Sequence, residues 1–208
     1  MADDLKNERR SLWGDVWARF KRNRLAMVGL FVIIFLYTVA ILAPALAPYP
    51  YDKMNLNNIY APPGSPGHIL GTDEFGRDVL SRLIYGARVS LTVGLVVVGM
   101  SSVVGITLGA IAGYYGGWID SVIMRVVDFL YAFPFFILAI TIVAILGPSL
   151  YNAMLALAVV SWVGYARMVR GQFLSLKQTE FVEAAKGAGA GDLRIMFVHL
   201  LPNALGPV

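Results

Sequence analysis

The chain has 208 residues, of which 58% are hydrophobic and only 14% are charged. This apolar content exceeds the roughly 45–50% of soluble domains and indicates a polytopic membrane protein. The net charge of +4 is small, and the positive residues collect beside apolar runs, which argues against a nucleic-acid-binding groove. The absence of cysteine excludes disulfides and thiolate chemistry, and two histidines without H-E-x-x-H spacing predict no metal site.

The N-terminal region combines a basic segment with the first apolar run. Residues 1–24 carry basic and aromatic side chains at helical spacing, which predicts a cytoplasmic segment with an interfacial helix, although a disordered tail fits residues 1–10 equally well. Residues 25–47 are uncharged and long enough to cross a bilayer of about 30 Å. A cleaved signal peptide is the alternative, but the run exceeds the usual roughly 7–15 apolar residues, and Pro48 follows directly.

The next region, residues 48–88, is polar and irregular before it becomes periodic. Its first part is rich in proline, glycine and asparagine, which predicts an extracytoplasmic loop. From Thr72 onward, apolar residues recur on one face, which predicts an interfacial helix leading into a second span at about 89–112. Capping of a surface helix by Thr72 and Asp73 is the plainer interpretation of the polar residues at its start.

The second span contains a glycine stripe. Gly105, Gly109 and Gly113 repeat every four residues, and small residues at this spacing allow close helix packing in lipid. An incidental glycine-rich helix is the alternative. In either case the stripe predicts packing and no chemistry.

Two further spans are expected, at about 122–146 and 153–165. Pro134 predicts a kink in the first of them. Arg125 and Asp128 lie one helical turn apart, so we expect them to form an intramembrane charge pair. Charges inside a membrane helix are functional candidates by default, and the alternative is that both residues anchor the helix end near the headgroups.

Orientation follows from the positive-inside rule. With a cytoplasmic N-terminus, these four spans leave thirteen of the 17 Lys and Arg residues on the cytoplasmic side. The same count places the segment after the fourth span, residues 166–201, in the cytoplasm.

That cytoplasmic segment contains a helix–elbow–helix at 178–202. Thr179 and Asp192 are the expected N-caps, and three glycines, Gly187, Gly189 and Gly191, interrupt the helix between them. The spacing of the second helix predicts one apolar stripe, made of Leu193, Met196, Phe197 and Leu200. Such a stripe suits docking into a groove on a soluble partner, and a hairpin without a partner is the alternative.

The loop resembles a known motif. Glu183-Ala184-Ala185, three residues, Gly189, nine residues and then His199-Leu200-Leu201-Pro202 is similar to the EAA loop of ABC-importer permeases, with histidine where the general pattern has isoleucine. Three more segments, 17–30, 70–91 and 124–140, resemble the C-type subunit of dipeptide, oligopeptide and nickel permeases.

This resemblance implies an all-α polytopic membrane helical bundle of the type I ABC-importer permease kind, truncated before its last two spans. It implies import of peptides or a related solute such as nickel through a multi-pass cell-membrane protein that is not itself an enzyme. The implied partners are membrane lipid, a second permease subunit of the B type, two ATP-binding subunits and an extracytoplasmic solute-binding protein. No P-loop is present, so we expect no cofactor on this chain, with ATP and Mg²⁺ on the partners. The coupling residues implied are Glu183, Ala184, Ala185, Gly189, Asp192, Leu193, Phe197, Leu201 and Pro202.

Two other classes of function are compatible with a membrane bundle. A secondary transporter or channel would need carboxylates deep in the spans, where Asp128 is the one candidate. A membrane scaffold would not need kinked and glycine-packed spans. Neither class accounts for the spaced loop motif.

Overall fold

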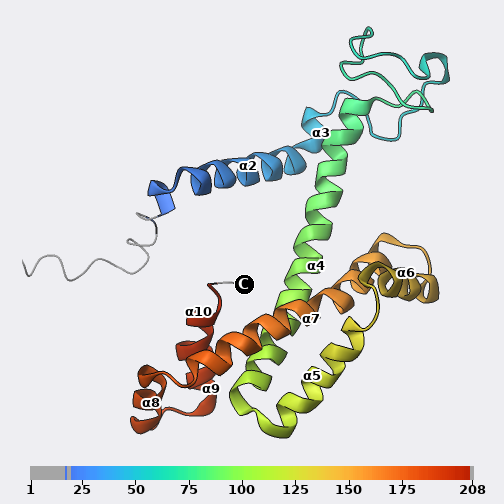
Figure 1. The fold of residues 1–208 in the computed structure, drawn as a ribbon. Coiled ribbons are helices and arrows are strands. Elements are labelled where there is room, and N and C mark those ends of the chain that lie inside the picture. The colour runs from blue at the N-terminus through green and yellow to red at the C-terminus, as the bar shows by residue number, and fades with distance from the viewer. Residues whose placement is uncertain (1–16, 18–19, 207–208) are drawn as a thin grey trace, which may run out of the picture. The chain divides into compact units, whose positions relative to one another are not determined.

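The structure is a computed structural model that describes Trp17 and residues 20–206. The predicted interfacial helix within 1–24 lies largely outside the described residues. The chain forms two compact units that meet between Thr92 and Val93, within one long helix, and each unit is considered by itself. The described elements are α2 (Arg24–Ile41), α3 (Ala43–Leu46), η2 (Leu56–Asn58), α4 (Val79–Tyr115), α5 (Gly117–Tyr131), α6 (Phe135–Leu146), α7 (Leu150–Leu176), α8 (Glu180–Gly187), α9 (Asp192–Arg194), η3 (Ile195–Leu200) and α10 (Leu201–Ala204) (Figure 1).

The described residues contain helices and no β-strand, so the predicted all-α class is confirmed. Three helices, α2, α4 and α7, are long and apolar enough to cross a membrane. A fourth crossing exists if α5 and α6, which meet at an angle of 90°, form one broken span. The predicted four-span arrangement therefore depends on how this bent pair is counted.

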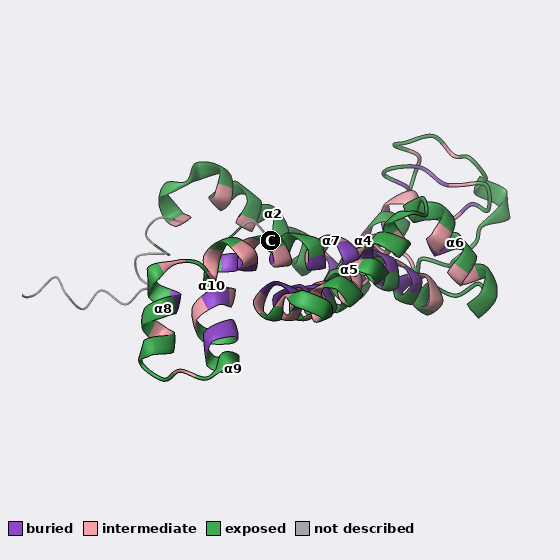
Figure 2. Ribbon diagram, turned by 60° about the horizontal axis from the view of Figure 1, so that its bottom comes forward, coloured by how far each residue is buried: buried purple, intermediate pink, exposed green. Residues whose placement is uncertain are grey.

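In the first unit, α2 is an apolar helix with a defined start. The side-chain oxygen of Asn23 accepts hydrogen bonds from the backbone N–H groups of Leu25 and Ala26, at 3.1 and 3.2 Å. Nearly the whole surface of α2 is exposed within this chain (Figure 2), as expected of a helix that faces lipid or another subunit. The predicted span 25–47 is not one rod, because a short helix with Pro44 in its first turn follows α2.

The loop between α3 and α4 is ordered by buried polar groups. His68 Nδ1 lies 2.9 Å from Asp78 Oδ1, and Asp78 Oδ2 accepts hydrogen bonds from the backbone N–H and hydroxyl of Ser81, at 2.8 and 2.7 Å. Ser81 Oγ in turn accepts from the backbone N–H of Tyr49. Burial raises the pKa of Asp78, but the bonds from His68 and Ser81 outweigh it and hold the pKa below its ordinary value of 3.8.

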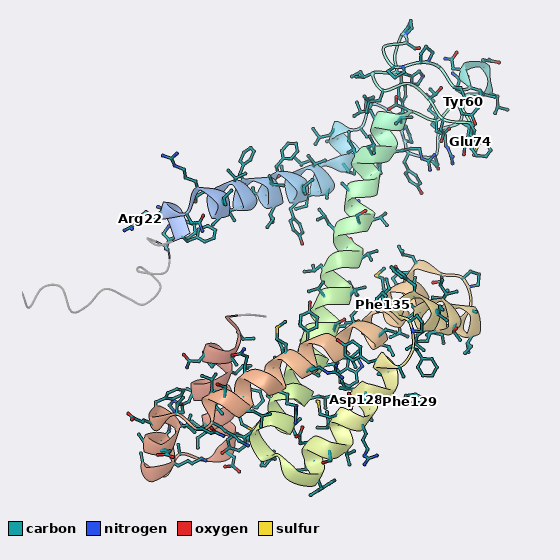
Figure 3. The ribbon with its side chains drawn as sticks, in the orientation of Figure 1. Arg22, Tyr60, Glu74, Asp128, Phe129 and Phe135 are labelled. Carbon is teal, nitrogen blue, oxygen red and sulfur yellow. The ribbon has the colours of Figure 1, made fainter. Side chains whose placement is uncertain are left out.

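A second carboxylate organises the turn before α4. Asp73 accepts hydrogen bonds from the backbone N–H groups of Phe75 and Arg77, and its side chain pairs with Arg77 and Arg82. Burial raises its pKa, but these bonds outweigh burial and hold the pKa well below the ordinary range. Figure 3 labels Glu74, at this turn, and Tyr60 in the same loop. Residues 72–78 thus form turns where an interfacial helix was expected, and α4 begins at Val79, after Asp78.

In the second unit, α7 packs along the C-terminal part of α4, and the two helices run in the same direction. At every step one partner lies 57 residues further along the chain, as for the hydroxyl of Ser101, which donates to the carbonyl of Ala158. The contacts repeat every four residues: Ser101 with Ala158, Gly105 with Trp162, Gly109 with Ala166 and Gly113 with Arg170. Small residues at each step allow the backbones to approach closely, as in other small-residue helix pairs in lipid.

The three glycines of the predicted stripe are the points of closest approach. A methyl group on Gly105 would lie 2.5 Å from the carbonyl oxygen of Trp162, and one on Gly113 would lie 2.5 Å from Cβ of Phe173. A methyl group on Gly109 would overlap the backbone of Ala166. Any side chain at these positions would therefore push the two helices apart.

The predicted third span, 122–146, consists of two helices. α5 ends at Tyr131, and α6 begins after Pro134, which occupies its N-cap position and has no N–H to continue the helix. The predicted kink at Pro134 is thus a bend of 90° between two separate helices. The far end of α6 is closed by Asn152, whose side-chain amide donates to the carbonyls of Leu146 and Gly147.

The best-packed region of the second unit lies at the C-terminal ends of α4 and α7. Buried apolar residues from α8, η3 and α10 meet Ala110 of α4 and Phe173 of α7 there. Figure 2 shows buried residues along α7 and in the stretch between the labels α9 and α10. The remaining members of this core are Val169, Val182, Ile195, Met196, Leu200 and Ala204. The segment after α7 is thus packed onto the helix ends and is not a free hairpin.

Candidate functional site

The candidate site is the segment 178–202, which begins with α8. Thr179 occupies the predicted N-cap position, but its hydroxyl donates to the carbonyl of Leu176 and does not cap α8. Val182 is buried and fixes the helix on the core, whereas Glu183 and Ala184 are exposed and Ala185 is half-buried. Glu183 in the first turn also suits the positive end of the helix dipole. The Glu-Ala-Ala triplet therefore presents two of its three side chains outward.

The elbow after α8 is a glycine turn. Gly189 has φ of +79°, a backbone conformation that glycine adopts without strain, and the backbone N–H of Ala190 donates to the carbonyl of Ala185 at 3.1 Å. Nothing lies within 4 Å of where a side chain on Gly189 would start. Backbone conformation, and not crowding, therefore requires glycine here. Gly187 and Gly191, the other two glycines of the predicted break, have negative φ.

Asp192 has a different role from the predicted N-cap. Gly191 occupies the cap position, and Asp192 is the first residue of α9. Its carboxylate accepts a hydrogen bond from the hydroxyl of Tyr114, on the last turn of α4, with an O–O distance of 2.7 Å. The sequence did not indicate this contact, because the two residues lie 78 positions apart.

The apolar stripe predicted for the second helix is divided between two environments. Met196 and Leu200 are buried in the core, while Leu193 and Phe197 remain 69% and 43% exposed. The cause is a π-helical turn, η3, in which the backbone N–H of Leu201 donates to the carbonyl of Met196, five residues back. Pro202 follows directly and has no N–H for an α-helical bond, which favours the wider turn.

The prediction that Arg125 pairs with Asp128 is wrong. Asp128 pairs with Arg167 of α7, whose guanidinium nitrogen lies 2.5 Å from its carboxylate. The guanidinium also lies over the ring of Tyr131, 4.3 Å from its centre. In Figure 3, Asp128 and Phe129 lie near the end of α5, shortly before Phe135 at the start of α6. Arg167 on a neighbouring helix lies within reach of Asp128, so the one-turn spacing between Arg125 and Asp128 does not determine the ion pair.

A second charge pair, which was not predicted from the sequence, lies at the other end of α5. Arg170 of α7 holds Asp120 of α5 with two hydrogen bonds, a bidentate arrangement that fixes the geometry. Nearby, the Lys177 ammonium donates to the carbonyl of Gly113 at 3.2 Å. The available signal was an acidic residue in the first turn of one apolar helix and basic residues near the end of another.

Within the described residues, no group of three or more His, Asp or Glu side chains is placed to hold a metal ion. A cavity of about 320 Å³ lies beside the bend and is lined mainly by apolar and aromatic residues, among them Tyr131, Phe133, Phe135 and Gly164. The described part of the chain shows packed helices, a glycine turn and charge pairs between helices.

These features define a multi-pass helical membrane protein with a helical segment packed on the ends of its spans. Residues 105–208 match the family model described as the binding-protein-dependent transport system inner membrane component. Residues 11–63 match the N-terminal transmembrane domain of oligopeptide transport permease C. The chain therefore belongs to the binding-protein-dependent transport system inner membrane component family, and the resemblance inferred from sequence is confirmed.

Curated relatives agree with this assignment. The chain is 48% identical to the dipeptide transport system permease protein DppC of Alkalihalophilus pseudofirmus, over 95% of this chain and 65% of the relative. It is 43% identical to DppC of Bacillus subtilis, over 100% and 64%, and 41% identical to the glutathione transport system permease protein GsiD of Pectobacterium atrosepticum, over 96% and 66%. The chain thus spans about two thirds of the length of these relatives.

Proposed function

We propose that the full-length protein is a permease subunit of an ATP-driven peptide importer. The observation that carries this proposal is the segment 178–202, which has the spaced EAA pattern and exposes Leu193 and Phe197 beside a glycine elbow. Curated relatives are named as dipeptide, oligopeptide and glutathione permeases, which supports a peptide as substrate over nickel. The importer would also contain a second permease, two ATP-binding subunits carrying ATP and Mg²⁺, and an extracytoplasmic binding protein.

In this proposal the segment works as a coupling element. Its buried side holds it to the ends of α4 and α7, and its exposed side offers two apolar anchors to a groove on a soluble subunit. Closure of the ATP-binding subunits would displace the segment and, through the packed core, the helix ends. The segment transmits only the difference between its contact free energies in the two states.

We infer a cytoplasmic N-terminus from the parallel arrangement of α4 and α7. Two spans that run in the same direction need a return crossing between them, and the bent pair of α5 and α6 supplies it. Four crossings then bring the N-terminus and the segment 178–202 to the same side. The distribution of Lys and Arg residues supports the cytoplasm for that side.

The alternative of a secondary transporter has less support. It needs an intramembrane carboxylate that is free to bind a coupling ion, and Asp128 already pairs with Arg167. A channel would in addition leave the EAA segment without a use.

The test is co-purification of the full-length permease with its ATP-binding subunits. Phe197→Ala removes an exposed anchor, so we expect about tenfold weaker retention of those subunits, as for a typical hot-spot residue. Trp118→Ala is the matched control, because Trp118 is an exposed aromatic residue on α5, outside the segment. Equal retention in wild type and both variants would contradict docking through Phe197, and absence of any ATPase from the wild-type preparation would contradict the importer itself.

A further inference from the structure

The coupling segment is joined to α4 in two physically different ways. The first is the apolar core, in which Met196 and Leu200 pack beside Ala110 and Phe173. Apolar contacts of this kind are non-directional, so packed helices are able to slide by small amounts with little change in buried area. The core therefore keeps the segment attached, but it does not by itself fix the position of the segment along α4.

The second connection is directional and consists of one side-chain pair. The Tyr114 hydroxyl donates to the Asp192 carboxylate at 2.7 Å. Among the side-chain hydrogen bonds of residues 20–206, this is the one that joins the segment 178–202 to α4. The other two polar links nearby, Lys177 with Gly113 and Arg170 with Asp120, start from the C-cap of α7 and from α7 itself, before the segment begins.

Each member of the pair lies on a helical stretch that contributes to the apolar core. The ring of Tyr114 packs against the apolar core and, edge to face, against Tyr115, with centroids 5.2 Å apart. Asp192 begins the helical stretch that continues through η3 into α10. A charged acceptor also makes the bond stronger than one between neutral groups. A displacement of the segment would therefore strain this hydrogen bond and pull on α4.

We propose that Tyr114 is a positioning residue for coupling: its hydroxyl holds Asp192 so that a displacement of the segment by the ATP-binding subunits is transmitted to α4. This inference rests on the proposed importer function and deepens it, because it identifies the contact through which a displacement of the segment reaches α4. Without the bond, the segment would still dock and the subunits would still hydrolyse ATP. Part of the displacement would be lost as sliding at the apolar core.

The experiment uses the complete importer, reconstituted with the full-length permease, and measures peptide uptake and ATP hydrolysis in the same vesicles. For Tyr114→Phe we expect uptake per ATP to fall about fivefold to tenfold, within the usual range of coupling between sites, while ATP hydrolysis and subunit composition stay as in wild type. Tyr115→Phe is the matched control. It removes the same hydroxyl one residue away, from a half-exposed ring with no side-chain hydrogen bond in the described structure, and should leave the ratio unchanged.

A double-mutant comparison tests whether the pair acts as a unit. Asp192→Asn should also lower uptake per ATP, and the variant that combines it with Tyr114→Phe should be no worse than the more affected single variant. Additive losses would overturn the pairing, and an unchanged ratio of uptake to ATP hydrolysis in Tyr114→Phe would overturn the positioning role.

Loss of assembly or a lower melting temperature in Tyr114→Phe would assign the hydroxyl to folding and would also overturn the positioning role. A wild-type complex without ATP-dependent uptake would refute the proposed function instead.

Discussion

At the scale of single residues, the close contact between α4 and α7 depends on glycines, which have no side chain. Gly105, Gly109 and Gly113 have no Cβ, and α7 occupies the space where a Cβ would stand. Two other glycines of α4, Gly94 and Gly99, have nothing within 4 Å of the same position. The same residue type on the same helix is thus required by packing at some positions and not at others.

This difference predicts opposite outcomes for two alanine substitutions. Gly109→Ala should destabilise the purified full-length permease by about 1–3 kcal/mol, because the new methyl group overlaps the backbone of α7. Gly99→Ala should be neutral or stabilising by up to about 1 kcal/mol, because alanine favours the helix and meets no neighbour. Thermal unfolding in detergent measures both, and equal melting temperatures for the two variants would show that α4 and α7 do not pack as described.

At the scale of elements, the loop between α3 and α4 is stabilised in part by the ionised carboxylate of Asp78. The pKa of Asp78 is lower in the folded loop than its ordinary value of 3.8, so its ionised form stabilises the loop. That contribution is fully present above about pH 4 and is lost as the pH falls through the folded pKa. The loop between α3 and α4 should therefore loosen in acid while the rest of the chain is less affected.

Hydrogen exchange of residues 49–78 measures this effect, with wild type and Asp78→Asn compared at the same pH. At pH 6, the variant should exchange faster, because the amide replaces the carboxylate that holds His68 and Ser81. At pH 3, below the ordinary pKa of 3.8, the difference should shrink, because the unfolded wild-type chain binds a proton that the folded loop disfavours. A difference that is equal at both values would rule out ionisation of Asp78 as the source of the stability.

Element boundaries mark where sequence patterns were and were not sufficient. The apolar runs identified α2, α4 and α7, and the four-residue glycine spacing identified the side of α4 that meets α7. The π-helical turn at η3 was not predicted, because the stripe was counted with α-helical periodicity. One wider turn was enough to separate Leu193 and Phe197 from Met196 and Leu200. The partner of Asp128 was also not predicted correctly. Local spacing favoured Arg125, whereas tertiary packing brings Arg167 of α7 to Asp128.

At the scale of the whole molecule, the proposed topology makes a prediction about accessibility. The 208 residues contain no cysteine, so single cysteines introduced here act as reporters within this part of the protein. Ser65→Cys and Tyr151→Cys should react with a membrane-impermeant maleimide in intact cells. Trp118→Cys and Glu183→Cys should react only after the cells are made permeable. Labelling of Tyr151→Cys and Trp118→Cys from the same side would show that α5 and α6 form a re-entrant pair and not a crossing.

The parallel ladder between α4 and α7 also has a consequence for how the protein is made. The contacts join residues at least 57 positions apart, so α4 leaves the ribosome well before the helix that covers its small-residue face. At typical synthesis rates this interval is about 3–11 s. During that time the glycine face of α4 meets lipid, or whatever insertion machinery holds it, and a competing helix has the opportunity to occupy it. The order of synthesis therefore leaves the small-residue face of α4 open to mispairing until α7 arrives.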